Sequence, residues 1–210
     1  MASYVFTLPF ALGDKDAEIL LARRQLIQTR SGGRTIRGRI PEWAGQWGLI
    51  GDAQGKGESA EATGIRAFRE QAGLDLSDRD VQSNFMLHNR SLVSAETAEY
   101  TPFNVLCIFT TRGALQLAQS VVSDALGTEQ VTEATLAEVE IRTVTSARNM
   151  LGPRRPPPKG WKSFLVQNYF GGTEPGAFNT EIDELTRLIA TRAAQDNSFF
   201  AAALDGKAPR

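Results

Sequence analysis

The chain has few of the residues that build cross-links or soft metal sites. Its 210 residues include one cysteine, Cys107, and one histidine, His88. A single cysteine excludes an intrachain disulfide and a cysteine-based metal cluster. One histidine cannot complete a zinc site with protein nitrogen and sulfur ligands alone. These absences leave function to be sought in other residue types.

The chain also lacks an excess of either charge and any long apolar run. Its 23 lysines and arginines nearly balance 24 aspartates and glutamates, whereas a dedicated nucleic-acid binder usually carries a strong basic excess. A local basic patch stays open. No run approaches the roughly 18 apolar residues of a membrane-spanning helix, and no basic region precedes the apolar N-terminal stretch. We therefore expect a cytoplasmic protein without a membrane partner.

The composition is that of an ordinary globular domain. Hydrophobic residues make up 41% of the chain and charged residues 22%, which is enough to build a sizeable core. We expect residues 1–150 to form the main domain. Residues 151–210 should add a proline-rich connector at 154–159 and an amphipathic helix at 179–194, packed on the same domain.

Strand and helix signals follow one another along the chain. Ser59 is a candidate N-cap and Gly73 a C-terminal stop for a helix at 59–72. The polar stretch 23–42, which carries six arginines, is expected to be a long loop. The remaining pattern predicts a second helix at 115–126 and strands at 4–12, 18–22, 46–50, 81–93, 101–111 and 136–144.

Residues 51–74 hold the most specific motif. They resemble the Nudix box, G-x5-E-x7-R-E-U-x-E-E-x-G-U with U aliphatic, and Phe68 takes the aliphatic position within it. The segments 18–24, 47–51 and 138–140 follow the order of the family's flanking elements. The resemblance to the Nudix hydrolase superfamily implies an α/β fold, a Nudix-type α/β/α sandwich with a mixed β-sheet and a C-terminal helix. Five further positions match in register: Glu58, Arg66, Glu70, Gly73 and Leu74.

The box departs from the family where the chemistry is done. Ala67 and Gln71 replace two of the three glutamates that hold divalent metal, normally magnesium, against a diphosphate in the family. Positions 67, 70 and 71 share one helix face because they are spaced i, i+3 and i+4. Asp52 stands in place of the first glycine, beside Gly51. The family's ordinary metal chemistry should therefore be weakened here.

The resemblance implies Mg²⁺ or Mn²⁺ as the cofactor, with Glu70 as its main ligand. Gln71 could add a neutral oxygen, since magnesium accepts one or two carboxylates completed by phosphates and waters. Glu138 and Glu140 are the candidates for the missing carboxylates, and Asp52 and Asp75 stay open as well. The sequence does not place any of these residues in space.

Other candidate site residues allow two interpretations each. Glu58 and Arg66 either brace the loop against the helix by a charge-assisted pair or act directly in catalysis. Arg23 and Arg24 either bind substrate phosphates or belong to a solvated loop. Trp47 either stacks on a base or packs beneath the box loop.

Three hypotheses for function follow. The first is an atypical hydrolase that cleaves the diphosphate linkage of a nucleoside diphosphate joined to another group. The second is a non-hydrolytic protein that binds a nucleotide or pyrophosphate compound on the same scaffold, and the third is a repurposed enzyme with metal-independent chemistry. Fold does not decide among them. The expected partner is a small nucleotide or diphosphate, and dimers, which are common in the family, suggest a homodimer.

Overall fold

The computed structural model describes residues 4–12, 17–39, 41, 44–79, 81, 88–95 and 103–150. The connector and the helix predicted within 151–210 lie outside these residues, as does most of the predicted strand segment 81–87. Within the described ranges, no helix is long and apolar enough to cross a membrane.

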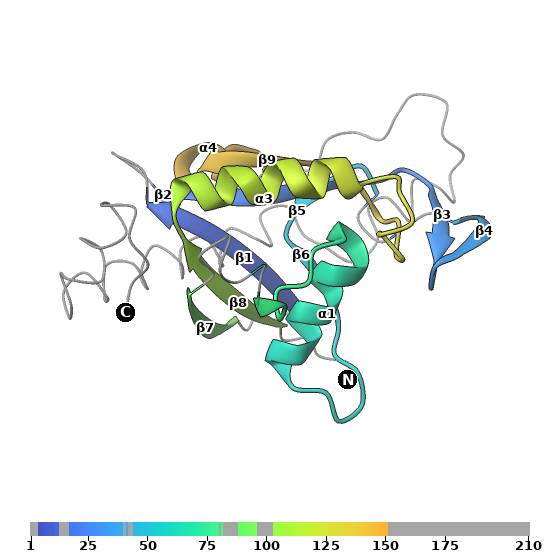
Figure 1. Ribbon diagram of the computed structural model, residues 1–210, viewed down its shortest axis with the longest axis horizontal. Coiled ribbons are helices and arrows are strands. Elements are labelled where there is room, and N and C mark those ends of the chain that lie inside the picture. The colour runs from blue at the N-terminus through green and yellow to red at the C-terminus, as the bar shows by residue number, and fades with distance from the viewer. Residues whose placement is uncertain are drawn as a thin grey trace.

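One mixed sheet of seven strands forms the centre of the fold (Figure 1). Its main path runs β5-β2-β1-β8-β7, with β6 also paired to β1 and β9 to β2. Strands β1 and β8 run parallel and the other pairs are antiparallel. The strands are β1 (Tyr4–Leu12), β2 (Ala17–Arg24), β5 (Trp47–Gly48), β6 (Ile50–Ala53), β7 (His88–Ala95), β8 (Phe103–Thr110) and β9 (Leu136–Thr143).

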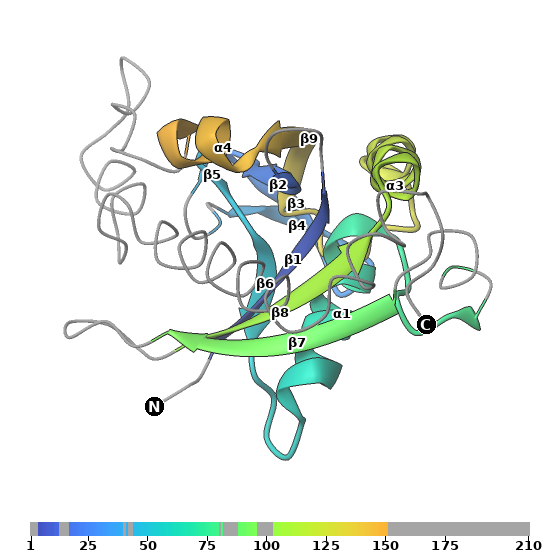
Figure 2. The same cartoon turned by 90° about the vertical axis from the view of Figure 1, so that its left-hand side faces the viewer.

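Helices cover both faces of this sheet. Helices α1 (Ala60–Ala72) and α3 (Arg112–Ala125) share one core with the strands, in which Phe68 of α1 and Leu115 of α3 are buried with Leu106 of β8. The short helix α4 (Val144–Met150) lies on the opposite side of the sheet from α3 (Figure 2). The mixed sheet between helices confirms the predicted α/β class. The apolar strand β8 lies between β1 and β7, as its composition predicted.

The capping residues predicted from the sequence mark the two ends of α1. The Ser59 hydroxyl accepts a hydrogen bond from the Ala62 N–H at 3.1 Å. Gly73 ends the helix with φ of 71°, and its N–H donates to the Arg69 carbonyl. An alanine there would need a left-handed conformation that costs about 1 kcal/mol. The helix that carries the box is thus fixed at both ends by local sequence.

Gly64 explains how α1 lies close to the sheet. A Cβ atom at this position would lie 3.2 Å from side-chain carbons of Leu106 and Thr7. The glycine costs roughly 1 kcal/mol of helix propensity relative to alanine. Close packing of α1 on β1 and β8 is what it permits in return.

The prediction of a long loop at 23–42 is wrong. Strand β2 extends to Arg24, and β3 (Gln28–Ser31) and β4 (Arg34–Arg39) form a separate two-stranded hairpin. Gly32 and Gly33 make its turn with φ of 56° and 72°, the left-handed values that a two-residue hairpin turn needs. The arginines hid the strand pattern, because the hairpin is held by hydrogen bonds and not by an apolar face.

Candidate functional site

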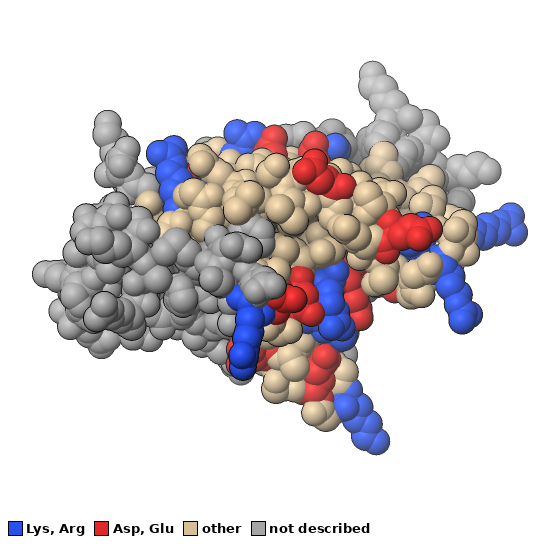
Figure 3. All heavy atoms as spheres, viewed as in Figure 1, with Lys and Arg blue, Asp and Glu red and all other residues tan. Residues whose placement is uncertain are grey.

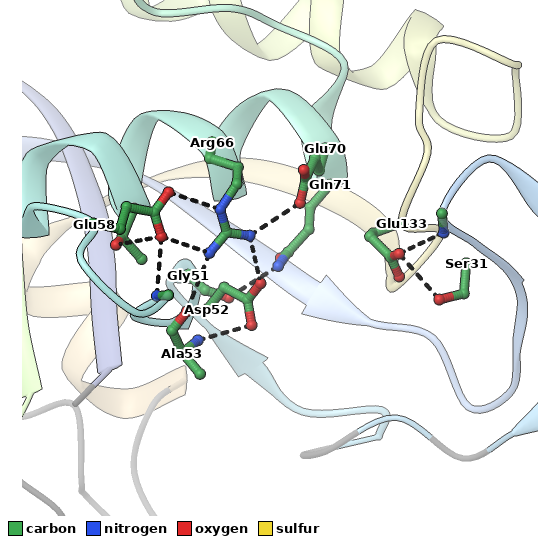
Figure 4. A network of polar contacts seen from close by, with 12 residues as sticks. Ser31, Gly51, Asp52, Ala53, Glu58, Arg66, Glu70, Gln71 and Glu133 are labelled. Carbon is green, nitrogen blue, oxygen red and sulfur yellow. Dashed lines mark hydrogen bonds and ion pairs between the residues drawn. The ribbon is translucent and has the colours of Figure 1, made fainter. Parts of the chain in front are cut away.

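Arg66 of α1 is the centre of a polar network at the start of the box (Figure 4). Its Nε donates to Glu58 at 2.9 Å, and Nη2 donates to Glu58 and to the Ala53 carbonyl, both at 3.1 Å. Its Nη1 donates to Asp52 at 2.9 Å and to Glu70 at 3.1 Å. A guanidinium has five N–H donors, and all five are used here. Arg66 therefore holds the loop, β6 and α1 together and has no N–H to spare for a ligand.

Glu58 secures the other side of this network. Its carboxylate also accepts from the Gly55 N–H at 3.0 Å and from the Thr63 hydroxyl at 2.9 Å. The hydrogen bonds from Arg66, together with those from Gly55 and Thr63, lower the pKa of Glu58 to about 2. Glu58 in turn raises the pKa of Arg66 further above its ordinary value. These contacts are those of a brace, and a direct catalytic role of either residue stays a prediction.

Asp52 and Glu70 are brought together by the same nitrogen of Arg66. Both carboxylates stay reachable from solvent, since the Asp52 side chain is 42% exposed and that of Glu70 27%. With Glu58, three carboxylates surround one guanidinium, which leaves a surplus of two negative charges. Of the four acidic residues that the sequence left open as partners for Glu70, the structure places Asp52 beside it.

The other two box positions face the interior. Ala67 is 0% exposed, and the buried Gln71 uses both ends of its amide. Its Oε1 accepts from Arg24 at 2.6 Å, and its Nε2 donates to the Gly51 carbonyl at 2.9 Å. Through these two hydrogen bonds, Gln71 links α1 to β2 and β6. A role as metal ligand would require it to give up one of these bonds.

Arg24 is not part of a solvated loop. The residue is only 7% exposed. Its guanidinium donates to the Thr135 hydroxyl and the Leu49 carbonyl as well as to Gln71. Arg24 is the last residue of β2 and is buried beneath the box. A phosphate-binding role for Arg24 is a prediction that this placement does not favour.

Arg23, Glu138 and Glu140 lie in pairs on neighbouring strands. Arg23 of β2 bonds to Glu138 of β9 at 2.5 Å, and Glu140 bonds to Arg142 of the same strand. Within the described residues, no three Asp, Glu, His or Cys side chains are grouped to hold a metal ion. The ligand set predicted around Glu70 is therefore not assembled by these strands, and the roles of Glu138 and Glu140 stay predictions.

Trp47 lies at the opposite edge of β2 from Glu138. It belongs to the short strand β5, is partly exposed, and is the register partner of Arg23. Neither stacking on a base nor packing beneath the loop is decided by this position. Trp47 lies beside the partly exposed Arg23, and Trp47 and Arg23 both stay predicted substrate-binding residues.

Glu133 is a further site residue that the sequence did not reveal. Its carboxylate accepts from the Gly32 N–H at 2.5 Å and from the Ser31 hydroxyl at 3.0 Å (Figure 4). It also accepts from the Gln28 amide at 2.8 Å. Its own N–H donates to the Glu70 carbonyl at 2.9 Å. It therefore ties the β3–β4 hairpin to the end of α1. No local pattern signals a contact across so many residues.

The described side chains fit one divalent ion at most. Oxygen ligands of the kind that magnesium prefers are available from Asp52 and Glu70, and such an ion can complete its shell with waters and substrate phosphates. A site for two or three ions is not supported, because position 67 is a buried alanine and the Gln71 amide is engaged. Arg66 already balances part of the negative charge that a metal would neutralise.

Comparison with known proteins finds likeness among solved structures alone. No family model matches, and no curated protein does. NrtR of Shewanella oneidensis, solved with a 27mer DNA, shares 14% sequence identity with this chain at a TM-score of 0.46. The match covers 91% of this chain and 63% of the NrtR chain. The NUDIX domain of Shewanella oneidensis NrtR complexed with ADP ribose shares 13% sequence identity at a TM-score of 0.44. This match covers 89% of this chain and 86% of that domain's chain. A mutT/nudix family protein from Listeria innocua shares 15% sequence identity at a TM-score of 0.44, and the match covers 92% of this chain and 94% of the Listeria chain.

Proposed function

We propose that this chain is an atypical hydrolase that cleaves, slowly, the diphosphate linkage of a nucleoside diphosphate joined to another group. The observation that carries the proposal is that Asp52 of β6 and Glu70 of α1 both accept a hydrogen bond from the same nitrogen of Arg66. The register of the box supports the substrate class, and Asp52 supplies a carboxylate where Ala67 and Gln71 have removed two. Cytoplasmic location and a homodimer stay predictions.

Each residue of the site then has a defined task. A bound magnesium or manganese ion would neutralise charge on the diphosphate and lower the pKa of a bound water. Asp52 and Glu70 are the residues that would hold it, and their exposure leaves room for waters and phosphate oxygens. Arg66 and Glu58 keep the two carboxylates in place by fixing the loop to α1. Arg23 of β2, which is partly exposed, is the arginine that we propose meets a substrate phosphate.

A second candidate function is binding without hydrolysis. It is favoured by the burial of Ala67 and by the engagement of Gln71 with Arg24, which together remove the family's metal chemistry from this face of α1. A scaffold of this kind would hold a nucleotide or pyrophosphate compound to sense or regulate. The repurposed, metal-independent enzyme has no observation of its own in its favour.

The hydrolase proposal is tested by turnover with Mg²⁺ or Mn²⁺ on a panel of nucleotide sugars, dinucleoside polyphosphates and dinucleotides. We expect release of phosphate-containing products at a low rate. Asp52→Asn and Glu70→Gln should each reduce kcat by at least about tenfold, because each removes charge that holds the ion. Glu61→Gln, an exposed neutral substitution on the same helix, is the matched control. Turnover that both site variants leave intact would sink the metal role.

Binding of the same panel separates the two candidates. A compound that raises the melting temperature without being turned over supports the non-hydrolytic function. Turnover that depends on Asp52 and Glu70 supports the hydrolase. A panel that is neither bound nor cleaved would contradict both, and with them the inferred substrate class.

A further inference from the structure

The β3–β4 hairpin presents an arginine-rich surface that the proposed function does not use. Residues 25–39 contain four arginines and no acidic residue. Lysine and arginine side chains project from the end of the molecule where β3 and β4 lie (Figures 1 and 3). We define this surface as the hairpin patch: Arg30, Arg34, Arg37 and Arg39 with the exposed Leu26 and Ile27.

Two of the four arginines are partly neutralised. Arg30 donates to the Thr128 carbonyl at 2.8 Å and lies 3.9 Å from Glu129. Arg39 donates to Gln28 and lies 3.8 Å from Glu133. In the part of the chain that the structure describes, Arg34 and Arg37 form no ion pair, and both are exposed on β4. The patch thus keeps a positive surplus centred on β4.

Strand β4 also offers a backbone edge that no described strand pairs with. In the described ranges its only strand partner is β3. The other edge of β3 is already covered, because Arg30 accepts from the Ala134 N–H and the Gly33 N–H donates to the Thr132 carbonyl. An exposed sheet edge is a template for an added strand. Three hydrogen bonds to the Glu133 carboxylate hold the hairpin in place.

We infer that β4 is the docking edge for an extended acidic segment of a partner protein. Backbone hydrogen bonds to the free edge would give affinity, and carboxylates beside Arg34 and Arg37 would give specificity. The exposed Leu26 and Ile27 offer apolar contacts beside the strand. Ile27 lies directly on Gly38, where a Cβ atom would approach it to 2.6 Å.

The observations disfavour two other occupants. A second copy pairing through β4 would set arginine strands against each other, and like charges across strands are destabilising. Single-stranded nucleic acid is usually held by aromatic stacking as well as by charge, whereas residues 17–39 contain no aromatic side chain. An acidic strand satisfies both the charge and the backbone edge.

The test uses the full chain and a fluorescein-labelled octapeptide of alternating glutamate and threonine, followed by fluorescence anisotropy. We expect saturable binding to the wild type. Arg34→Glu with Arg37→Glu should weaken it at least about tenfold, because repulsion replaces attraction on β4. Lys56→Glu with Arg79→Glu makes the same charge change at exposed positions elsewhere and should leave binding within about twofold.

Three further probes make the outcome decisive. A peptide N-methylated at every residue keeps its charges but loses the backbone donors of both strand edges, so it should not bind. A single-stranded DNA oligonucleotide of equal charge should bind more weakly than the peptide, and peptide binding should not change the oligomeric state of the chain. Absence of peptide binding, equal binding of the N-methylated peptide, or stronger binding of DNA would each overturn the inference. Hydrolysis of the diphosphate panel is measured separately and does not depend on this result.

Discussion

Arg66 shows how one side chain can redefine a motif. Its guanidinium meets Glu58, Asp52 and Glu70 with four of its five donors and the Ala53 carbonyl with the fifth, so the cation that gathers these carboxylates is part of the protein. Charge-assisted hydrogen bonds of this kind are about twice as strong as neutral ones. The box is therefore held together without requiring a bound metal.

The pKa of Glu58 leads to a pH prediction. The folded-state pKa of about 2 lies below the ordinary 4.5, so its stabilising contribution is complete above pH 4.5 and is lost as the pH falls toward 2. Glu58→Gln should lower the free energy of unfolding by roughly 2 kcal/mol at pH 7. Below pH 4.5 its deficit relative to wild type should shrink. Thermal unfolding followed by circular dichroism between pH 7 and 3 measures this.

Glu61→Gln is the control for this series, since Glu61 is an exposed carboxylate on the same helix. Its melting temperature should stay close to that of the wild type across the range. A Glu58→Gln deficit that does not change with pH would contradict the assigned shift.

Ala67 gives the second prediction at this scale. Ala67→Glu, which introduces the glutamate of the Nudix box pattern, places a longer, charged side chain at a fully buried position. Overpacking and burial of a charge together should cost about 3 kcal/mol or more. Urea unfolding checks this against Ala62→Glu, an exposed position on the same helix, which should change stability by under about 0.5 kcal/mol. Equal stability of the two variants would show that position 67 opens to solvent.

At the scale of elements, the segment 128–135 links parts that are distant in sequence. Glu133 receives three hydrogen bonds from the β3–β4 hairpin and donates its N–H to Glu70 at the end of α1. A two-stranded hairpin alone is marginally stable. The hairpin therefore depends on this carboxylate for its order.

Glu133→Ala should loosen the hairpin without unfolding the domain. Loss of three acceptor contacts should speed amide hydrogen exchange in residues 28–39 by at least about tenfold, whereas α1 should change little. Glu129→Ala is the matched control, because the Glu129 side chain is 97% exposed and, among the described residues, its one ion pair is with Arg30 at 3.9 Å. Equal exchange in the two variants would count against Glu133 as the tie.

At the scale of the whole molecule, helices on both faces of a mixed sheet place the polar network of Arg66 along α1, next to β6. The core is apolar and continuous through α1, α3 and the sheet. Folding of this core needs no ion, since the carboxylates near the surface already face a guanidinium. Metal binding should therefore be a separate event from folding.

This separation predicts the effect of metal removal. EDTA should leave the melting temperature of the purified protein unchanged. Added Mg²⁺ at about ten times its Kd should stabilise the fold by about 1.4 kcal/mol, and Asp52→Asn with Glu70→Gln should abolish that gain. Differential scanning calorimetry measures all three states. A large loss of stability in EDTA would instead indicate a resident ion.

The sequence by itself determined the class of fold and offered the brace as one of two interpretations of Glu58 and Arg66. Ser59 and Gly73 bound α1 through local capping, and periodicity placed the main strands and α3, because these signals act over a few residues. The register of Glu58 with Arg66 likewise follows from fixed spacing along one loop and helix. Such features need no knowledge of the rest of the chain.

Tertiary structure decided which groups meet. Asp52 became the neighbour of Glu70, Gln71 turned inward to Arg24, and Glu133 reached the hairpin that the sequence had suggested was a loop. These contacts depend on how β2, β6 and the segment 128–135 pack around α1, which no local pattern encodes. Long-range packing thus fixes the chemistry that the box retains, whereas local sequence fixes only its frame.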